Sequence, residues 1–323
     1  MKPTFPYALL CATTILASSV PVCLADHGPG TSGGGVLTQS AETLKPGKFA
    51  AEVREDFTEF ENISLGASQE KAANAGSFDI LDRSSITSLN IAYGVFENFQ
   101  VSAKMGYYAA VRAREVEFDA DEDESEITTY NPNGFTDLWL TGKYRLYRGP
   151  IGQFAVMSGI KIPTGRWDVK NSAGELVEPS ATAGSGSWDV LFGTAYSRFI
   201  TARWTVDTSF QYILRTEAHC FKLGDRIDAG LATAYRIVGD VDTYPQVSIF
   251  GEINFRYLFE TLESGVRDAN TGGATLFLTP GVRFGITKWC SLTVSSPLPV
   301  VQELNGEQLK TAYKITAGLS FSF

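Results

Sequence analysis

The feature that most constrains the fold of this chain is a strict alternation of apolar and polar side chains. Over residues 309–323 the odd positions carry mainly apolar side chains, while the even positions carry lysine, hydroxyl and small side chains. Alternation with a period of two places one set of side chains on each face of an extended strand. The segment is therefore predicted to be a β-strand with one apolar and one polar face.

Twelve segments show this alternation, and most of them have 10–14 residues. Strands of soluble proteins usually have about 5–6 residues, whereas a tilted strand needs roughly 9–11 to cross a bilayer. The fold is therefore predicted to be all-β, a transmembrane antiparallel β-barrel of about 12 strands. The segments are 47–60, 84–93, 99–112, 135–147, 152–162, 187–198, 204–215, 225–237, 245–260, 274–284, 291–301 and 309–323.

The connections between these segments alternate in length. The first, third and fifth are long and polar, and the second, fourth and sixth are tight. Short turns at one end and long loops at the other are typical of outer-membrane barrels. An even number of strands then places both termini of the barrel on the periplasmic side. The long connections are 61–83, 113–134 and 163–186, and the tight ones are 94–98, 148–151 and 199–203.

The N-terminus has the pattern of a secretory signal. Lys2 precedes an apolar stretch, and Cys23-Leu24-Ala25 places small residues before a cleavage point. We therefore expect residues 1–25 to be a cleaved signal peptide and 47–323 to be the barrel. Residues 26–46 are Gly-rich, and they are expected either to plug the lumen or to form a periplasmic tail. In the first case Val36 and Leu37 would pack against apolar lumen residues such as Phe250 and Phe277.

A soluble β-sandwich is the alternative fold, because its strands also alternate. Three features together favour the barrel: the signal, the strand length and the terminal phenylalanine. The last strand resembles the C-terminal assembly signature of bacterial outer-membrane barrels, through Tyr313, Leu319, Phe321 and Phe323. This predicts location in the bacterial outer membrane, with outer-membrane lipid, lipopolysaccharide and the barrel-assembly machinery as partners.

Composition excludes other classes. Charged residues make up 20% of the chain, and the mean hydropathy is -0.04. This composition is too polar for a bundle of membrane helices. A sequence pI of about 4.9 and a net charge of -9 argue against a nucleic-acid partner.

The sequence offers little support for catalysis. A lipid hydrolase in the outer membrane needs a histidine beside a serine at the membrane edge. His219 is the one candidate, and no recognisable triad surrounds it. Cys220 and Cys290 are placed at opposite ends of the barrel and are expected to be free thiols. We therefore expect no enzyme activity, no cofactor and no metal site.

The polar faces of the predicted strands carry many charged side chains that would line the lumen. They form either a ladder of ion pairs that fills the barrel or a polar pathway with a constriction. On β-strand 274–284, for example, Leu278 is expected to face lipid and Thr279 the lumen. The lumen-lining candidates are Arg54, Lys104, Arg112, Asp137, Lys143, Arg145, Lys161, Asp189, Arg236, Glu252, Arg256, Arg283 and Lys314.

Three stretches resemble the outer-membrane barrels of the "MetA pathway of phenol degradation" family, which are relatives of hydrophobic-compound transporters. They are 134–137 leading into 143–145, then 159–165, and then 184–189. The most specific part is Pro163-Thr164-Gly165, at a strand-to-loop corner. The resemblance implies an outer-membrane barrel and the uptake or export of small, often aromatic, compounds.

The sequence thus predicts an outer-membrane barrel for passive transport of small molecules. The second interpretation is a structural or adhesive barrel with a filled lumen and ligand-binding outer loops. The third is an outer-membrane lipid hydrolase.

Overall fold

The computed structural model describes residues 35–119, 124–240 and 243–323. The expected signal peptide, 1–25, and the first part of the Gly-rich segment, 26–34, lie outside the described residues. Within the described ranges no helix has the length and apolar content needed to cross a membrane.

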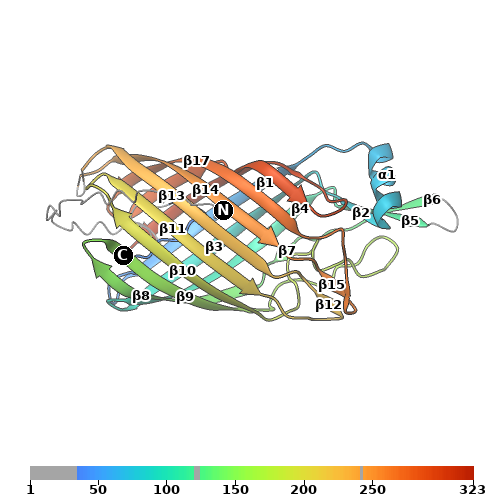
Figure 1. Ribbon diagram of the computed structural model, residues 1–323, viewed down its shortest axis with the longest axis horizontal. Helices are drawn as coiled ribbons and strands as arrows, with labels where there is room; N and C mark the ends of the chain where they lie inside the picture. The colour runs from blue at the N-terminus through green and yellow to red at the C-terminus, as the bar shows by residue number, and fades with distance from the viewer. Residues whose placement is uncertain (1–34, 120–123, 241–242) are drawn as a thin grey trace, which may run out of the picture.

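The described chain forms one closed antiparallel barrel of twelve strand positions, which confirms the predicted fold class (Figure 1). Each strand pairs with its neighbours in the chain, and β1 closes the ring against β20. The barrel strands are β1 (Phe49–Phe60), β3 (Arg83–Phe96), β4 (Phe99–Val111), β8 (Leu138–Gly149), β9 (Gly152–Ile162), β10 (Asp189–Phe199), β11 (Trp204–Leu214), β13 (Arg226–Val238), β14 (Gln246–Leu258), β17 (Gly273–Thr287), β18 (Cys290–Ser295) with β19 (Leu298–Leu304), and β20 (Thr311–Ser322).

Two strand positions are interrupted. β18 and β19 both pair with β17 and together occupy one position, broken at Ser296 and Pro297. Pro297 cannot donate to a ladder, which accounts for the break. Likewise β7 (Gly134–Phe135) pairs with β4 just before β8, and Thr136 and Asp137 separate the two.

The apolar side chains face outward. On β17, Leu278 is 47% exposed while its neighbour Thr279 is fully buried. Because successive side chains point to opposite faces, this difference fixes the register of the strand. The predicted orientation of this pair is therefore correct, but Thr279 is not in a watery lumen, since its hydroxyl donates to Asn254 at 3.0 Å.

The two ends of the barrel differ, as Figure 1 shows. At one end, here called the turn end, the connections are short, and β1 begins beside the end of β20. At the other, the loop end, the connections contain structure of their own. There α1 (Leu65–Ala75) packs on a small sheet of β2 (Ser77–Ile80), β5 (Arg114–Asp119) and β6 (Glu124–Thr129).

This loop-end module has its own small core. Ala72, Phe78, Ile80 and Val116 form a buried cluster between α1 and the sheet. Ser64 caps the helix by accepting a hydrogen bond from the Ala67 amide. The connection 61–83 is long, as the sequence predicted, but the helix α1 and the strand β2 within it were not predicted. A second small sheet joins β12 (Phe221–Lys222), β15 (Leu262–Glu263) and β16 (Val266–Arg267).

Candidate functional site

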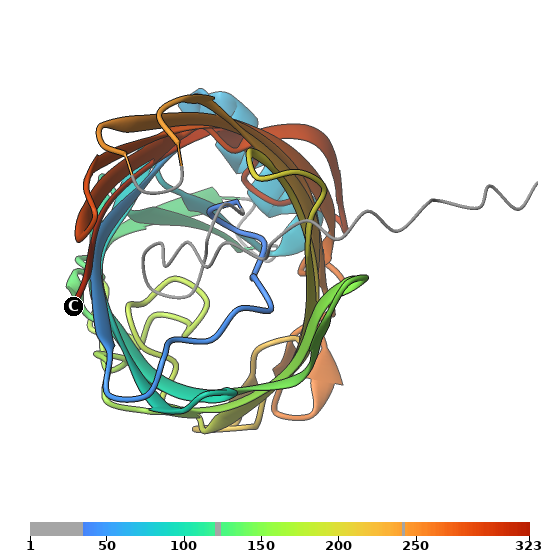
Figure 2. The same cartoon turned by 90° about the vertical axis from the view of Figure 1, so that its left-hand side faces the viewer.

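Residues 35–46 run inside the barrel, where they cross the ring in the end-on view of Figure 2. The contacts begin at the middle of β14, with Glu252. Its carboxylate accepts hydrogen bonds from the backbone amides of Val36 at 2.5 Å, Leu37 at 3.1 Å and Thr38 at 2.8 Å. Three consecutive amides therefore converge on one side chain of the wall.

Glu252 is completely buried, so its charge needs compensation from within the protein. Besides the three backbone amides it accepts from the Thr38 hydroxyl at 2.8 Å and from the Asn254 side-chain amide at 3.2 Å. Hydrogen bonds to an ionised acceptor are shorter and stronger than neutral ones. The segment thus supplies most of the groups that make a buried carboxylate tolerable at this position.

A second anchor lies nearer the turn end, on β8 and β10. The Ser197 hydroxyl accepts from the Ala41 amide at 2.8 Å and lies 3.0 Å from the Ser40 hydroxyl. It also donates to Asp207 of β11, which is buried. From the other side Lys143 donates to the Ser40 carbonyl at 3.0 Å. The segment is therefore bound to the wall through polar groups of β8 and β10, and Asp207 of β11 supports Ser197.

The segment leaves the lumen at a third anchor. The Leu44 amide donates to Gln100 of β4 at 2.9 Å, and the Leu44 side chain packs on Ala50 and Ala92. The backbone amides of Val36 and Leu37 are held by Glu252, and packing of their side chains on apolar lumen residues stays a prediction. Glycine at position 35 lets the carboxylate come this close, because a Cβ there would lie 1.9 Å from the Glu252 carboxyl carbon and would displace it.

The segment leaves part of the lumen open. A cavity of about 140 Å³ lies between residues 35–39 and the wall formed by β1, β3, β4, β17, β18 and β20. Its lining is polar and includes Arg54, Lys104 and Arg283, together with Glu52 and Asn90.

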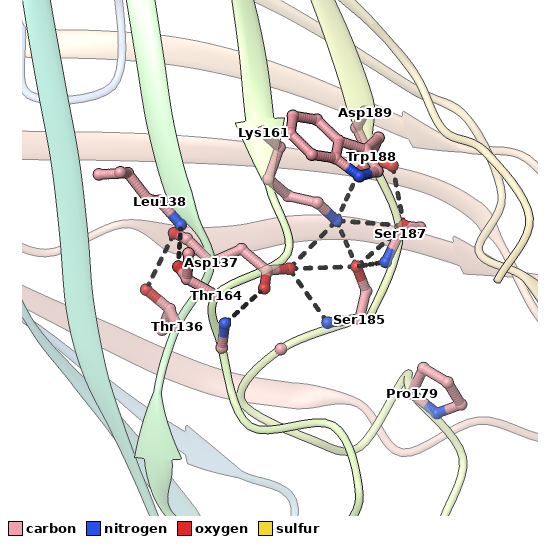
Figure 3. A network of polar contacts seen from close by, with 12 residues as sticks. Thr136, Asp137, Leu138, Lys161, Thr164, Pro179, Ser185, Ser187, Trp188 and Asp189 are labelled. Atoms are coloured by element: carbon pink, nitrogen blue, oxygen red, sulfur yellow. Dashed lines mark hydrogen bonds and ion pairs between the residues drawn. The ribbon is translucent and has the colours of Figure 1, made fainter. Parts of the chain in front are cut away.

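A second polar network lies at the loop ends of β8, β9 and β10. Lys161 lies between two carboxylates, at 2.6 Å from Asp189 and 3.3 Å from Asp137 (Figure 3). Ser185 and Ser187 complete the group, and Ser187 donates to Asp189 at 3.0 Å. The three stretches that carry the family resemblance thus meet here in one buried cluster.

This network fixes the long connection 163–186. The Asp137 carboxylate accepts from the Gly165 amide at 2.9 Å and from the Ser185 amide at 3.0 Å, so it ties both ends of the connection to β8. Gly165 and Gly184 touch, since a Cβ on Gly184 would lie 2.5 Å from the Gly165 carbonyl carbon. Only glycine permits such an approach of two backbones. The cluster therefore positions the loop at the mouth of the barrel.

The loop end is acidic. Burial first, and then the charge of Asp79, raises the pKa of Glu115 to about 7. The same two causes, in the same order, raise the pKa of Glu178 to about 7. Asp79 itself accepts a hydrogen bond from Tyr130 at 2.9 Å. Carboxylates of β2, β5 and the connection 163–186 thus share one region above the lumen.

Other predicted lumen residues form pairs on the wall. Arg54 is 2.6 Å from Asp56, and Arg256 is 2.8 Å from Asp228. Arg145 donates to Gln153 at 3.1 Å. Two more of the predicted lumen residues have other surroundings. Lys314 lies over the Phe277 ring, and Arg236 lines a small cavity at the turn end.

Arg112 is an exception among the candidates. It follows the end of β4 in a left-handed backbone conformation, its side chain is 74% exposed, and it pairs with Asp82 at 3.2 Å. The prediction that it lines the lumen is therefore wrong, because the strand ends one residue earlier than the alternation suggested.

The C-terminal residues that resemble an assembly signature lie on the outer surface at or near the end of β20. Phe323 is exposed and its amide donates to the Phe49 carbonyl at 2.8 Å. Phe321 stacks between Trp289 and Phe323, with ring centroids 6.2 and 6.5 Å away. Tyr313 and Leu319 also face outward.

His219, the residue on which the hydrolase interpretation depends, packs against an aromatic ring. Its imidazole stacks on Trp167 at 3.7 Å. Among the hydrogen bonds found in the described ranges, none joins it to a serine. Cys220 and Cys290 are free thiols, as predicted.

Solved structures share the fold. The chain is similar to the COG4313 outer membrane channel from Pseudomonas putida F1, with a TM-score of 0.59, 14% identity and coverage of 88% of this chain and 98% of that chain. The NanC porin matches with a TM-score of 0.44 and 11% identity over 84% of this chain and 98% of its own. The CymD monoaromatic hydrocarbon channel matches with a TM-score of 0.40 and 11% identity over 86% of this chain and 88% of its own. The last two scores are too low to support an argument.

No curated protein matches the chain. A family model does, over residues 70–296, which is most of the barrel and includes the whole Asp137–Lys161–Asp189 network. The resemblance seen in the sequence is thereby confirmed. The chain belongs to the family described as "Putative MetA-pathway of phenol degradation".

Proposed function

We propose that this protein is a channel of the bacterial outer membrane that allows small molecules to move passively across it. The observation that carries the proposal is the polar cavity between residues 35–39 and the barrel wall. The turn end would face the periplasm and the loop end the outside, as in other outer-membrane barrels.

The physical basis is the size of the barrel. Eight strands leave an interior filled by side chains, whereas sixteen or more leave an aqueous channel. Twelve strands lie between these cases, and here a chain segment occupies part of the lumen. The remaining passage is narrow and lined by Arg54, Lys104 and Asn90 among others. It suits small solutes and would exclude large ones.

Small aromatic compounds are the solutes that the family description favours, since it names phenol degradation. Two buried aromatic side chains, Phe250 and Phe277, lie on the lumen side of β14 and β17. Their rings contact cations, with Arg283 over Phe250 and Lys314 over Phe277. A solute with both an aromatic and a polar part fits such surroundings better than a pure hydrocarbon.

The test uses purified protein in liposomes and a pair of adjacent substitutions on β20. Gly318 lines the cavity, whereas Ala317 faces outward toward Glu55 and Val294. Gly318→Phe should fill the passage, while Ala317→Phe adds the same side chain on the lipid side. Liposomes with wild-type protein or Ala317→Phe should swell in arabinose but not in the larger stachyose, and Gly318→Phe should abolish the swelling.

Swelling of wild-type liposomes no faster than that of protein-free liposomes would overturn the proposal. It would favour the second interpretation, a structural or adhesive barrel whose lumen is filled and whose loop end binds a partner. That interpretation has its own support in the folded loop-end module built on Phe78 and Val116.

A further inference from the structure

The charges around the open part of the lumen are unbalanced. Three cations, Arg54, Lys104 and Arg283, line the cavity, against the one carboxylate of Glu52. Asp56 pairs with Arg54 from outside this lining, so the cations exceed the nearby carboxylates by one. Lys104 is exposed within the lumen, and among the residues that the structure describes it forms no ion pair or hydrogen bond. The described lining of this cavity thus carries more cations than carboxylates in a chain with a net charge of -9.

Two buried carboxylates of the barrel wall lie on the side of the segment that faces away from the cavity. Glu252 is sealed by the amides of residues 36–38, and Asp207 is 2% exposed behind Ser197, which binds the segment. Neither residue lines the cavity. The segment therefore divides the lumen by charge: it covers two carboxylates of β14 and β11 and leaves the cations of β1, β4 and β17 facing the passage.

Arg283 is placed firmly in this passage. Its guanidinium lies 5.8 Å above the Phe250 ring, and its Nε donates to Thr293 at 3.2 Å. Phe250 itself lies across Gly281, where a Cβ would approach the ring to 2.1 Å. A glycine on β17 thus makes room for an aromatic platform that supports the charge.

The same charge continues toward the turn end. A second, smaller cavity shares Arg283, Ser291 and Ser320 with the first. Its lining adds Arg236 and Lys288 and contains no carboxylate among the described residues. The two cavities therefore share part of their lining, and cations outnumber carboxylates around both.

We propose that this passage selects small organic anions, and in particular carboxylates, over cations. The proposal rests on the channel function proposed above and names its class of solute. Fixed charges of one sign in a narrow, low-dielectric cleft raise the local concentration of counter-ions. Rings of arginine and lysine act in this way in anion pores, and the planar guanidinium fork matches a carboxylate.

The experiment measures the reversal potential of purified protein in a planar bilayer under a potassium chloride gradient. Wild-type protein should pass chloride in preference to potassium. Lys104→Gln combined with Arg283→Gln should lower the chloride-to-potassium permeability ratio by roughly tenfold. Arg112→Gln removes an exposed arginine outside the lumen and should leave the ratio unchanged. Potassium benzoate, added as the probe, should reduce the chloride current of wild-type protein more than that of the double variant.

A wild-type channel that prefers potassium, or a double variant with an unchanged ratio, would overturn the selectivity while leaving the channel itself established. Complete absence of conductance would overturn the proposed function and this inference together. Heat-modifiable migration on a gel checks that each variant is folded, and Lys104→Gln alone, at an exposed position, gives the same test with a smaller expected decrease.

Discussion

Glu252 of β14 and Thr38 of the lumen segment are joined twice, since the carboxylate accepts hydrogen bonds from both the amide and the hydroxyl of Thr38, each at 2.8 Å. The two residues are 214 positions apart in the chain. A buried carboxylate and a run of free backbone amides each carry a desolvation cost alone, and each compensates the other here. The pair explains why a Gly-rich segment without strand pattern is held in place.

The first prediction concerns this pair. Glu252→Gln removes the charge and turns a donor toward the amides, so it should weaken docking of residues 36–38. A hydrogen bond to a charged group contributes about 1.5–3 kcal/mol, which is roughly a 10- to 150-fold change in equilibrium. Hydrogen exchange of these amides should accelerate by that factor. Asp228→Asn is the control, because Asp228 binds Arg256 and Arg226 and not the segment; equal protection in all three proteins would refute the anchor.

The second prediction concerns the network at the loop end. Lys161→Met would leave Asp137 and Asp189 buried together without their cation, and breaking a buried ion pair in this way costs about 3–5 kcal/mol. Denaturant unfolding should show a loss of this size. Lys310→Met, at an exposed position, should cost almost nothing. If Lys161→Met is as stable as Lys310→Met, the Asp137–Lys161–Asp189 network does not stabilise the loop end of the barrel.

The third prediction tests the lipid face. Leu278→Arg places a charge toward the hydrocarbon and should cost about 2–4 kcal/mol if the residue lies at the bilayer midplane. The matched variant for comparison is Asn90→Arg, because Asn90 lines the polar cavity. Thr279→Arg is less suitable, because Thr279 is fully buried. Refolding titrations into vesicles should therefore separate the two variants. Equal losses would show that the assigned faces are wrong.

The fourth prediction concerns pH. The pKa of Glu115 is about 7 in the folded protein, above the 4.5 of the free side chain, so the folded state binds more protons between these values. The stability that this group contributes is fully present below pH 4.5 and is lost as the pH rises through about 7. Glu178 acts in the same direction. The protection factors of the β5 amides, which are corrected for base catalysis of the intrinsic exchange, should be lower at pH 8 than at pH 5.

Matched variants make this pH test specific. Glu115→Gln with Glu178→Gln should flatten the dependence, because an amide does not titrate. Glu70→Gln, on the exposed face of α1, should leave the pH dependence as it is. A dependence that persists in the double variant would assign it to other groups, with Asp79 the first to examine.

Much of the fold could be read from alternation alone. The strands are long and nearly all pair with their neighbours in the chain, so local pattern and topology agree, and the predicted 152–162 matches β9 residue for residue. The helix Leu65–Ala75 was missed because its polar composition suggested a loop. Its signals were present, with Ser64 as N-cap and Gly76 after the last turn.

The site was harder to predict, because its contacts join distant parts of the chain. Lys161 and Glu252 were both predicted to line the lumen, but no periodicity could show that one lies between two aspartates and the other binds residues 36–38. Arg112 was misplaced for the opposite reason, since alternation continues past the true end of the strand.

The measurement that tests the central claim most directly is single-channel conductance of the protein with and without residues 35–44. If the segment narrows a real passage, its removal should raise the conductance while heat-modifiable migration shows an intact barrel, since β1 and β20 close the ring without it. A folded deletion variant whose conductance equals that of the full-length protein would contradict the claim that solutes pass beside the segment.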